Sequence, residues 1–403
     1  MIVGIVSEYN PFHNGHLYQI NKIREEFGED TYIIAIMSGN YVQRGGVAIA
    51  DKGLRAKCAV LCGVNLVLEL PFPYSMASAE FFAKSAVHIL NSLGCVDVIS
   101  FGSEIGDIKT LEKIAKVMVS NNYTSLLKQY IDDAKFAKIG YPEICELALN
   151  KTLGEDFSVP FTPNNILAIE YIKALISLNS TIKPHTIKRI GADFSNHQIV
   201  QGEVQSATAI RHSIENKDIT ALEFIPNITK NIFLDAIESG DFPCNEEALA
   251  SAILSSFRLN SSTEAVGIQD AVGGLYNRLR EISFETNTIS DMVNSAESKK
   301  FTKARIRRAI FNSYLSVTSS QVNELPQYTQ ILAMDSGGRA ILKSIRKQCD
   351  LSILTKPSDT DSLSEIAKAQ KRASDRADSV FQLTKPLPKS GNYSLRFTPF
   401  VKK

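Results

Sequence analysis

Apolar positions in the first half of the chain follow two alternating patterns. Short runs rich in β-branched residues and bounded by Gly, Pro or Asn are typical of strands buried on both faces of a parallel sheet. Such runs cover residues 2–6, 31–37, 64–70, 96–101 and 181–190. Apolar residues at helical spacing occupy residues 17–27, 54–62, 79–93 and 165–178. The alternation predicts a doubly wound α/β domain whose ligands bind at the carboxyl ends of the strands.

The pattern changes after about residue 206. Helical periodicity predominates, at residues 207–216, 246–259, 271–284 and 303–315, and strand signals are sparse until the tail. The polar stretch 356–379 is compatible with a helix that carries Leu363, Ile366 and Ala369 on one face. We therefore expect a Rossmann-like doubly wound parallel sheet over residues 1–205, followed by a mainly α-helical domain over residues 206–403.

Composition excludes several classes of protein. With 44 Lys+Arg, 43 Asp+Glu, a net charge of +1 and 44% hydrophobic residues, the chain is neither disordered nor able to coat nucleic acid through charge alone. No apolar run approaches the ~20 residues of a membrane span, and no cationic region precedes the apolar start, as a secretory signal would require. Six Cys are no disulfide framework, so we expect a reduced, cytoplasmic protein.

The strongest motif directly follows the first predicted strand. His13 and His16, three residues apart at a helix start, can direct both rings at one anion. Gly15 lets a phosphate approach the backbone closely, and the helix N-terminus adds free N–H groups and a partial positive charge. Two surface histidines at a turn are the alternative, but the strand–HxGH–helix order favours a nucleoside triphosphate site with imidazole donors.

These residues resemble a known superfamily. His13-x-Gly15-His16 after a first strand is the signature of the HIGH nucleotidyltransferases. The longer run from Glu8 to Leu17 resembles the opening of the bacterial tRNA(Met) cytidine acetate ligases, with Asn40 standing where some relatives have His. Further stretches match in order, at residues 37–40, 43–45, 69–71, 101–104, 163–167 and 206–211, and more weakly at 301–315 and 331–342.

The resemblance implies a reaction. Such ligases activate acetate with ATP to form acetyl-adenylate and release pyrophosphate. They then transfer the acetyl group to the wobble cytidine of elongator tRNA(Met), which yields N4-acetylcytidine. The implied cofactors are ATP and Mg²⁺, and the partners are acetate and tRNA, with no membrane. Oligomeric state stays open.

Site residues follow from the motif and the resemblance. His13, His16 and Arg211 are the expected catalytic residues, because imidazole and guanidinium donors can neutralise charge at the phosphates. Ser206 either binds phosphate or caps its helix, Asn164 either caps a helix or binds adenosine, and Gly102 either makes room for the nucleoside or forms a turn. The expected ATP-binding set comprises Ser7, Tyr9, Asn10, Phe12, His13, Gly15, His16, Gly102, Asn164, Arg189, Ser206 and Thr208.

The second half holds a dense basic cluster. Six basic residues and no acidic residue lie between Lys299 and Arg308. A solvated helix face is the ordinary interpretation, but the imbalance favours contact with a phosphate backbone. This local excess of positive charge means that the chain can contact nucleic acid locally, even though its net charge of +1 is too small to hold RNA over the entire surface. The expected tRNA-binding residues are Lys299, Lys300, Lys303, Arg307 and Arg308.

Other candidates have simpler interpretations. Cys58 and Cys62 have the spacing of metal ligands on a helix, but no second pair accompanies them, so we expect core residues and no metal site. Asp51, Lys52 and Arg55 either close over the site or cap and solvate the next helix.

Two other functions remain. A small-molecule adenylyltransferase would need little beyond the first domain, so the large helical half favours an RNA substrate. A non-catalytic RNA-binding protein would not need the intact motif residues His13, Gly15, His16 and Arg211.

Overall fold

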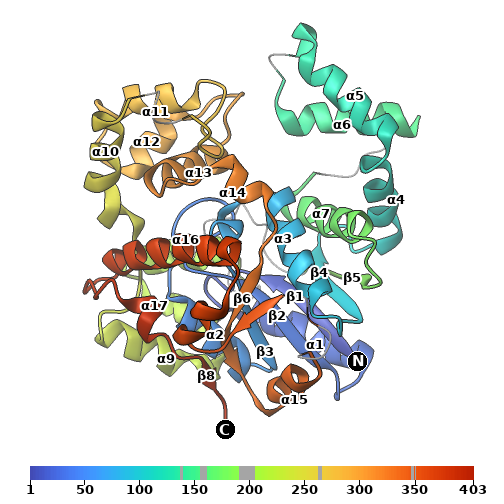
Figure 1. The fold of residues 1–403 in the computed structure, drawn as a ribbon, viewed down its shortest axis with the longest axis vertical. Coiled ribbons are helices and arrows are strands. Elements are labelled where there is room, and N and C mark those ends of the chain that lie inside the picture. Colours follow the sequence, from blue (N-terminus) through green and yellow to red (C-terminus); the bar gives the residue numbers. More distant parts are fainter. Residues whose placement is uncertain (137–138, 155–160, 190–204, 262–265, 346–348, 350) are drawn as a thin grey trace.

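One sheet organises the molecule (Figure 1). The structure, a computed structural model, describes residues 1–136, 139–154, 161–189, 205–261, 266–345, 349 and 351–403. The sheet has the strand order β5-β4-β1-β2-β3-β6-β7, and β8 pairs with β6. Its five parallel strands are β1 (Ile2–Ser7), β2 (Tyr32–Ser38), β3 (Leu66–Leu70), β4 (Val98–Ser103) and β5 (Lys183–Lys188). These match the five predicted strands, although Ile190, the predicted end of the last, lies outside the described residues.

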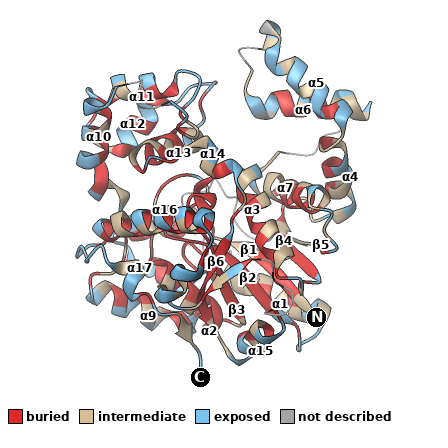
Figure 2. Cartoon of the chain, viewed as in Figure 1, coloured by how far each residue is buried: buried red, intermediate tan, exposed pale blue. Residues whose placement is uncertain are grey.

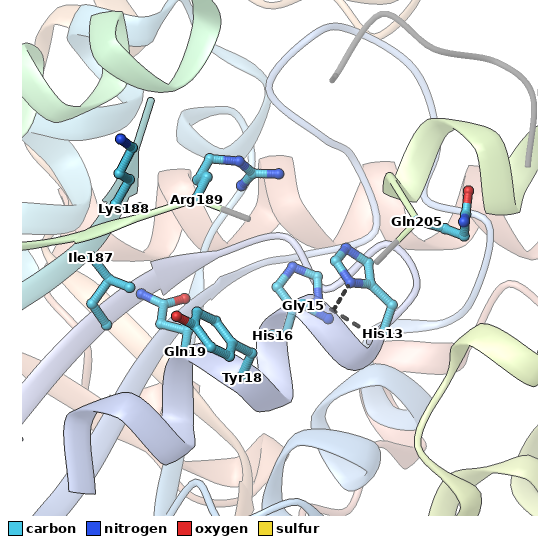
Figure 3. Close-up of a pocket in the computed structure, with 10 residues that line it drawn as sticks. His13, Gly15, His16, Tyr18, Gln19, Ile187, Lys188, Arg189 and Gln205 are labelled. Atoms are coloured by element: carbon cyan, nitrogen blue, oxygen red, sulfur yellow. Dashed lines mark hydrogen bonds between the residues drawn. The ribbon is translucent and has the colours of Figure 1, made fainter. Parts of the chain in front are cut away.

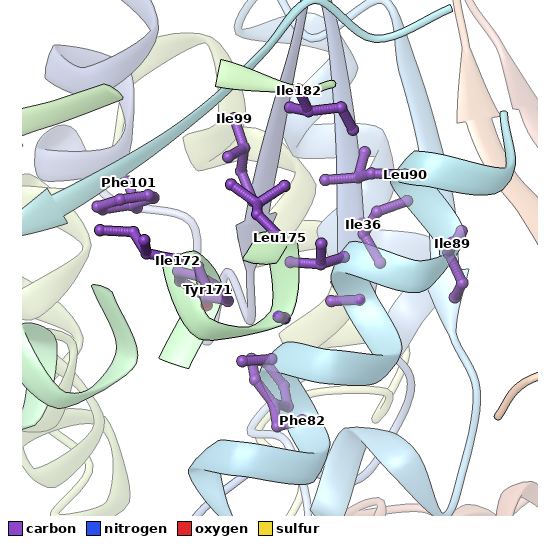
Figure 4. Packing of buried hydrophobic residues seen from close by; sticks show 14 of the residues in the cluster. Ile36, Phe82, Ile89, Leu90, Ile99, Phe101, Tyr171, Ile172, Leu175 and Ile182 are labelled. Carbon is purple, nitrogen blue, oxygen red and sulfur yellow. The ribbon is translucent and has the colours of Figure 1, made fainter. Parts of the chain in front are cut away.

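Helices cover both faces of the sheet. Because successive residues of a strand point to opposite sides, Ile34 and Ile36 of β2 enter one core cluster, and Ile33 and Met37 enter the other. The first cluster packs beneath α3 (Ala79–Ser92) and α7 (Pro163–Ser177), as Figure 4 shows. The second lies under α1 (Asn14–Phe27), α2 (Lys52–Leu61), α8 (Ala207–Glu215) and α9 (Asn227–Glu238). The predicted doubly wound arrangement is confirmed.

Two helical groups rise above the sheet in Figure 1. One contains α10 (Ala250–Leu259), α11 (Leu275–Ser283), α12 (Ile289–Ala296), α13 (Lys303–Tyr314) and α14 (Ser319–Asn323). The other consists of α5 (Asn121–Asp132) and α6 (Tyr141–Leu153), which follow α4 (Ile108–Met118) and project away from the sheet. Figure 2 shows buried residues concentrated in the sheet and its covering helices.

The second half also contributes to the sheet. We predicted few strands there, but β6 (Tyr328–Met334) pairs antiparallel with β3, and β7 (Ser352–Leu354) and β8 (Phe400–Val401) pair with β6. The antiparallel direction brings Tyr328 beside the carboxyl end of β3. The predicted division between residues 205 and 206 stays a prediction, because one sheet draws strands from both sides of it.

The long C-terminal helix buries a different face from the one predicted. In α16 (Glu365–Phe381), Ile366 and Ala369 are exposed, whereas Gln370, Ser374 and Asp378 are buried. After α15 (Ser336–Ile345) and α16, the tail continues through α17 (Tyr393–Arg396) to β8, so it wraps over the sheet. No helix in the described part of the chain combines the length and apolar character that a membrane span requires.

Candidate active site

A pocket lies at the carboxyl ends of β4 and β5, beside the N-terminus of α1 (Figure 3). It opens onto about 550 Å³ of empty space. The start of α1 contributes His13, Gly15 and His16 to its wall, and Gly102 and Arg189 come from the ends of the strands. The structure therefore brings together five of the residues predicted from the sequence, at the edge of the sheet where an α/β fold binds ligands.

The two histidines are held in one tautomer. The His13 backbone N–H donates to His16 Nδ1 at 3.2 Å, and the Gly15 backbone N–H donates to His13 Nδ1 at 3.0 Å. A ring nitrogen that accepts a hydrogen bond carries no proton, so in each neutral ring the proton resides on Nε2. The rings stack with centroids 3.8 Å apart. The site thus presents two neighbouring Nε2–H donors.

Both imidazoles are neutral at physiological pH. Burial, with a further contribution from the nearby charges of Arg189 and Arg211, lowers the pKa of His13 to about 3. Burial also lowers the pKa of His16 well below its usual value, with added repulsion from His13 and Arg189. The histidines can therefore donate hydrogen bonds to phosphate oxygens without carrying a charge, while the positive charge comes from the arginines.

Aromatic residues before the motif pack against the His16 ring. Tyr9 and Phe12 are buried, and their rings lie 4.9 and 5.5 Å from the His16 ring, centroid to centroid. The Asn10 side-chain oxygen accepts a hydrogen bond from the Ile49 backbone N–H at 2.8 Å. Of the predicted ATP-binding residues, Ser7, Tyr9, Asn10 and Phe12 do not line the described pocket.

The start of α8 lies beside the motif. Ser206 caps the helix by accepting from the Ala209 N–H at 3.1 Å, as the simpler interpretation predicted. Arg211 donates to the Asn10 carbonyl oxygen at 2.8 Å and to Thr208 Oγ1 at 3.2 Å. Arg211 is therefore fixed against the loop that leads into the histidines, although neither it nor Ser206 and Thr208 lines the pocket itself.

Glu104 binds the start of α7, and neither Glu104 nor the predicted ATP-binding residue Asn164 lines the described pocket. Glu104 accepts from Asn164 Nδ2 at 2.6 Å, from Thr162 Oγ1 at 2.7 Å and from the Asn165 backbone N–H at 2.8 Å. Burial by itself would raise the pKa of Glu104, but these hydrogen bonds lower it below the usual range. Asn164 thus lies inside the first turn of α7, whose N-cap is Thr162, rather than at the cap position.

Gly102 makes room for Arg189. A Cβ at Gly102 would lie 3.2 Å from Arg189 Cγ, which is closer than ordinary van der Waals contact. The missing side chain therefore serves the arginine as well as any ligand in the pocket.

Sequence reasoning missed half of the pocket lining: Tyr18, Gln19, Ile187, Lys188 and Gln205. Gln19 follows His16 by three positions, so helical spacing could have found it. Ile187 and Lys188 are the last two residues of β5. They could have been predicted, because the carboxyl ends of parallel strands form the binding edge of the sheet. Nothing local marked Gln205.

The predicted basic cluster is partly neutralised by distant acids. Arg307 pairs with Glu246, with both carboxylate oxygens 2.6 Å from Nη2. Arg308 is buried and pairs with Asp270 at 2.9 Å. Lys299, Lys300 and Lys303 are exposed. The fold thus keeps three lysines of the cluster on the surface and places Arg308 inside.

Of the two interpretations of Asp51, Lys52 and Arg55, the structure supports the helix cap for Asp51, and it buries the two cations instead of solvating them. Lys52 and Arg55 are buried, and Asp51 caps α2 through the Gly53 N–H at 2.7 Å. Cys58 and Cys62 are buried core residues, as predicted. Within the described ranges, no group of three or more His, Cys, Asp or Glu side chains is placed to hold a metal ion.

Comparison with known proteins agrees with this geometry. A family model described as HIGH Nucleotidyl Transferase matches residues 1–394. The tRNA(Met) cytidine acetate ligase of Acetivibrio thermocellus is 36% identical, over 89% of this chain and 88% of that protein. The ligase of the same name from Thermosipho africanus is 37% identical, over 98% of this chain and 94% of that protein.

Two solved structures are similar over their whole length. The apo crystal structure of Thermotoga maritima TmcAL has a TM-score of 0.91 and 29% identity, and covers 99% of both chains. The crystal structure of the same protein bound with alpha-thio ATP has a TM-score of 0.89 and 30% identity, again over 99% of both chains.

Proposed function

Because this chain belongs to the tRNA(Met) cytidine acetate ligase family of HIGH nucleotidyltransferases, we propose that it joins acetate to a cytidine of tRNA(Met) at the expense of ATP. The observation that carries the proposal is the pair of Nε2–H donors on His13 and His16, which face a pocket that Arg189 also lines. Neutral donors beside fixed cations suit a site where negative charge grows on phosphate oxygens.

The first step forms acetyl-adenylate. A carboxylate oxygen of acetate attacks the α-phosphorus of ATP, the bond to the β-phosphate oxygen breaks, and pyrophosphate leaves. The imidazole donors of His13 and His16 stabilise the oxygens on which charge develops. Arg211, Ser206 and Thr208 at the start of α8 are proposed to hold the departing pyrophosphate, since a helix N-terminus favours anions.

The second step transfers the acetyl group. The N4 amine of the wobble cytidine in elongator tRNA(Met) attacks the acetyl carbonyl carbon, the bond to AMP breaks, and the amine loses a proton. The product is N4-acetylcytidine. We propose that residues 1–205 carry this chemistry and that the helical part of residues 206–403 presents the RNA, in the cytoplasm, where tRNA and ATP occur together.

Mg²⁺ is proposed to accompany ATP. Magnesium usually keeps several waters and binds substrate phosphates with one or two carboxylates rather than an all-protein cage. A site without a cluster of ligating side chains among its described residues fits that mode of binding. The ion would supply charge neutralisation on the phosphates.

Incorporation of labelled acetate tests the function. The protein is incubated with ATP, labelled acetate and tRNA, and label is measured in acid-precipitable RNA and, after digestion, in N4-acetylcytidine. We expect label in RNA only when ATP is present. ATP consumption without label in RNA would contradict the ligase and favour a small-molecule adenylyltransferase.

The three exposed lysines near α13 are proposed to contact the RNA backbone. Replacing Lys299, Lys300 and Lys303 together by Gln should weaken tRNA binding. The plot of log affinity against log salt should become shallower by roughly 0.7–0.9 per lost contact, because each phosphate contact releases counterions. ATP affinity should not change.

Lys343→Gln on α15 is the matched control, because this exposed lysine lies at the opposite end of the molecule from α13. Equal salt slopes for the triple variant and the wild type would contradict the proposed interface.

A further inference from the structure

A tight hairpin lies between β2 and α2. Tyr41 and Val47 form a bridge, the Val42 N–H donates to the Gly46 carbonyl oxygen at 3.1 Å, and the Gly45 N–H donates to the Val42 carbonyl oxygen at 2.9 Å. Gly45 and Gly46 have φ values of 86° and 117°, which favour glycine. The hairpin is therefore a defined structure with Arg44 near its tip.

Helix α13 holds one side of this hairpin. The Arg307 Nε donates to the Gly45 carbonyl oxygen at 2.8 Å, while its Nη2 pairs with Glu246. A Cβ at Gly45 would lie 2.5 Å from the Arg308 backbone nitrogen, so only glycine allows this approach. Arg307 thus binds both Glu246 and the backbone of Gly45, and so fixes the backbone next to Arg44.

The other side of the hairpin is anchored to the end of β1. The Gln43 backbone N–H donates to Glu8 Oε1 at 2.9 Å. Glu8 lies two residues before Asn10, whose carbonyl oxygen accepts from Arg211. Arg44, between two anchored neighbours, is therefore held beside the residues that lead to the histidine motif.

Three arginines and several carboxylates meet at this position. Burial lowers the pKa of Arg211, and the nearby positive charges of Arg44 and Arg307 lower it as well. The carboxylates of Glu8 and Glu215 oppose this shift. Arg44 itself is exposed. The carboxylates offset part of the repulsion among these cations, and a bound anion would reduce it further. The triphosphate of ATP carries more charge than acetate, and it extends beyond the α-phosphate that the histidines face.

We propose that Arg44 binds the β- and γ-phosphates of ATP together with Arg211, and that Arg307 is a positioning residue that holds Arg44 there through Gly45. This inference rests on the proposed use of ATP. It also gives Arg307, which the sequence placed among the RNA contacts, a role at the ATP site.

Nucleotide titrations test the role of Arg44. ATP and AMP are titrated separately into the full-length protein without acetate or tRNA. For Arg44→Ala we expect the Kd for ATP to rise at least tenfold and the Kd for AMP to stay within twofold of wild type, since AMP lacks the β- and γ-phosphates. Arg44→Lys should recover part of the loss, because it retains the charge. Arg339→Ala, an exposed arginine on α15, should match wild type.

Two results would overturn the proposal. An unchanged Kd for ATP would show that Arg44 does not bind the triphosphate, and an equal rise for ATP and AMP would show that the hairpin merely supports the nucleoside site. If the wild type transferred no acetate, the proposed function would be refuted. The titrations would still test the role of Arg44, because they use neither acetate nor tRNA.

A double-mutant cycle tests the role of Arg307. Arg307→Gln, made together with Glu246→Gln so that no carboxylate is left unpaired, should reduce ATP affinity but not AMP affinity. Added to Arg44→Ala, the pair should cause little further loss, because both changes remove the same contact. A full additive loss, or a loss in RNA binding alone, would show that Arg307 does not act through Arg44.

Discussion

Replacing His16 by Ala is expected to slow acetate-dependent exchange of pyrophosphate into ATP by about 10²–10³-fold, the usual loss when one donor to a developing charge is removed. The His16 Nε2–H is fixed as a donor because its Nδ1 accepts from the His13 backbone N–H. Ala removes both interactions. ATP binding should change much less than the exchange rate, since the donor acts mainly in the transition state.

Two controls distinguish hydrogen-bond donation by His16 from an effect of a charge on its ring. His16→Gln, which retains an N–H donor without an ionisable ring, should recover part of the rate. His212→Ala, an exposed histidine of α8 that does not line the described pocket, should behave as wild type.

The pH profile provides a further check. Because the pKa of His13 is lowered to about 3, the rate should show no titration of this histidine between pH 6 and 8. A rate that rises towards pH 6 with an apparent pKa near 6.5 would contradict neutral imidazole donors.

Replacing Lys52 by Met is expected to destabilise the fold by about 3–5 kcal/mol, the range for removing one partner of a buried ion pair. Lys52 Nζ lies 2.7 Å from Glu69 Oε1 and 2.6 Å from Asp378 Oδ2, and all three residues are buried. Without Lys52, the two carboxylates would lose the cation that binds both of them. Chemical denaturation with urea at pH 7 measures the loss.

Neutral partners should rescue this variant. Adding Glu69→Gln and Asp378→Asn to Lys52→Met removes the unpaired charges and should restore part of the free energy of unfolding. Burial already raises the pKa of Glu69, while Lys52 opposes that shift. Without Lys52, the Glu69 carboxyl takes up a proton more readily in the folded state than in the unfolded state. The folded state of the variant is therefore stabilised as the pH falls. The loss in Lys52→Met should therefore be smaller at pH 5 than at pH 8.

Lys368→Met, on the surface of α16, is the matched control and should change stability little. Equal effects for the two lysine variants would contradict the argument from burial.

Local patterns predicted the first half of the fold well. The strands of the parallel sheet are continuous apolar runs, and the periodicity of α1, α2, α3 and α7 follows from the face that each buries. The order strand, HxGH, helix located the pocket, because the N-terminus of a helix after a parallel strand must lie at the binding edge of the sheet.

Other elements depend on partners that are distant in the chain. In β6, Thr329 and Gln330 interrupt the apolar pattern, but Thr329 Oγ1 donates to the Glu69 carbonyl oxygen at 2.6 Å, so a polar residue is accommodated in the core. In α16, Asp378 is buried because Lys52 and Asn40 bind it. A periodicity that counts apolar residues cannot recognise a buried face made of satisfied polar groups.

The sequence alone determined the chemistry that this chain offers: two histidines at a helix start after a strand, with a glycine between them, because those properties depend on neighbours within a few residues. The tertiary structure decided which charged groups lie near those histidines. Arg44, Arg211 and Arg307 lie far apart in the chain, and Glu246 and Asp270 neutralise part of a cluster that has no acid within it. Charge acts through space, so its balance at a site is known only once the chain is folded.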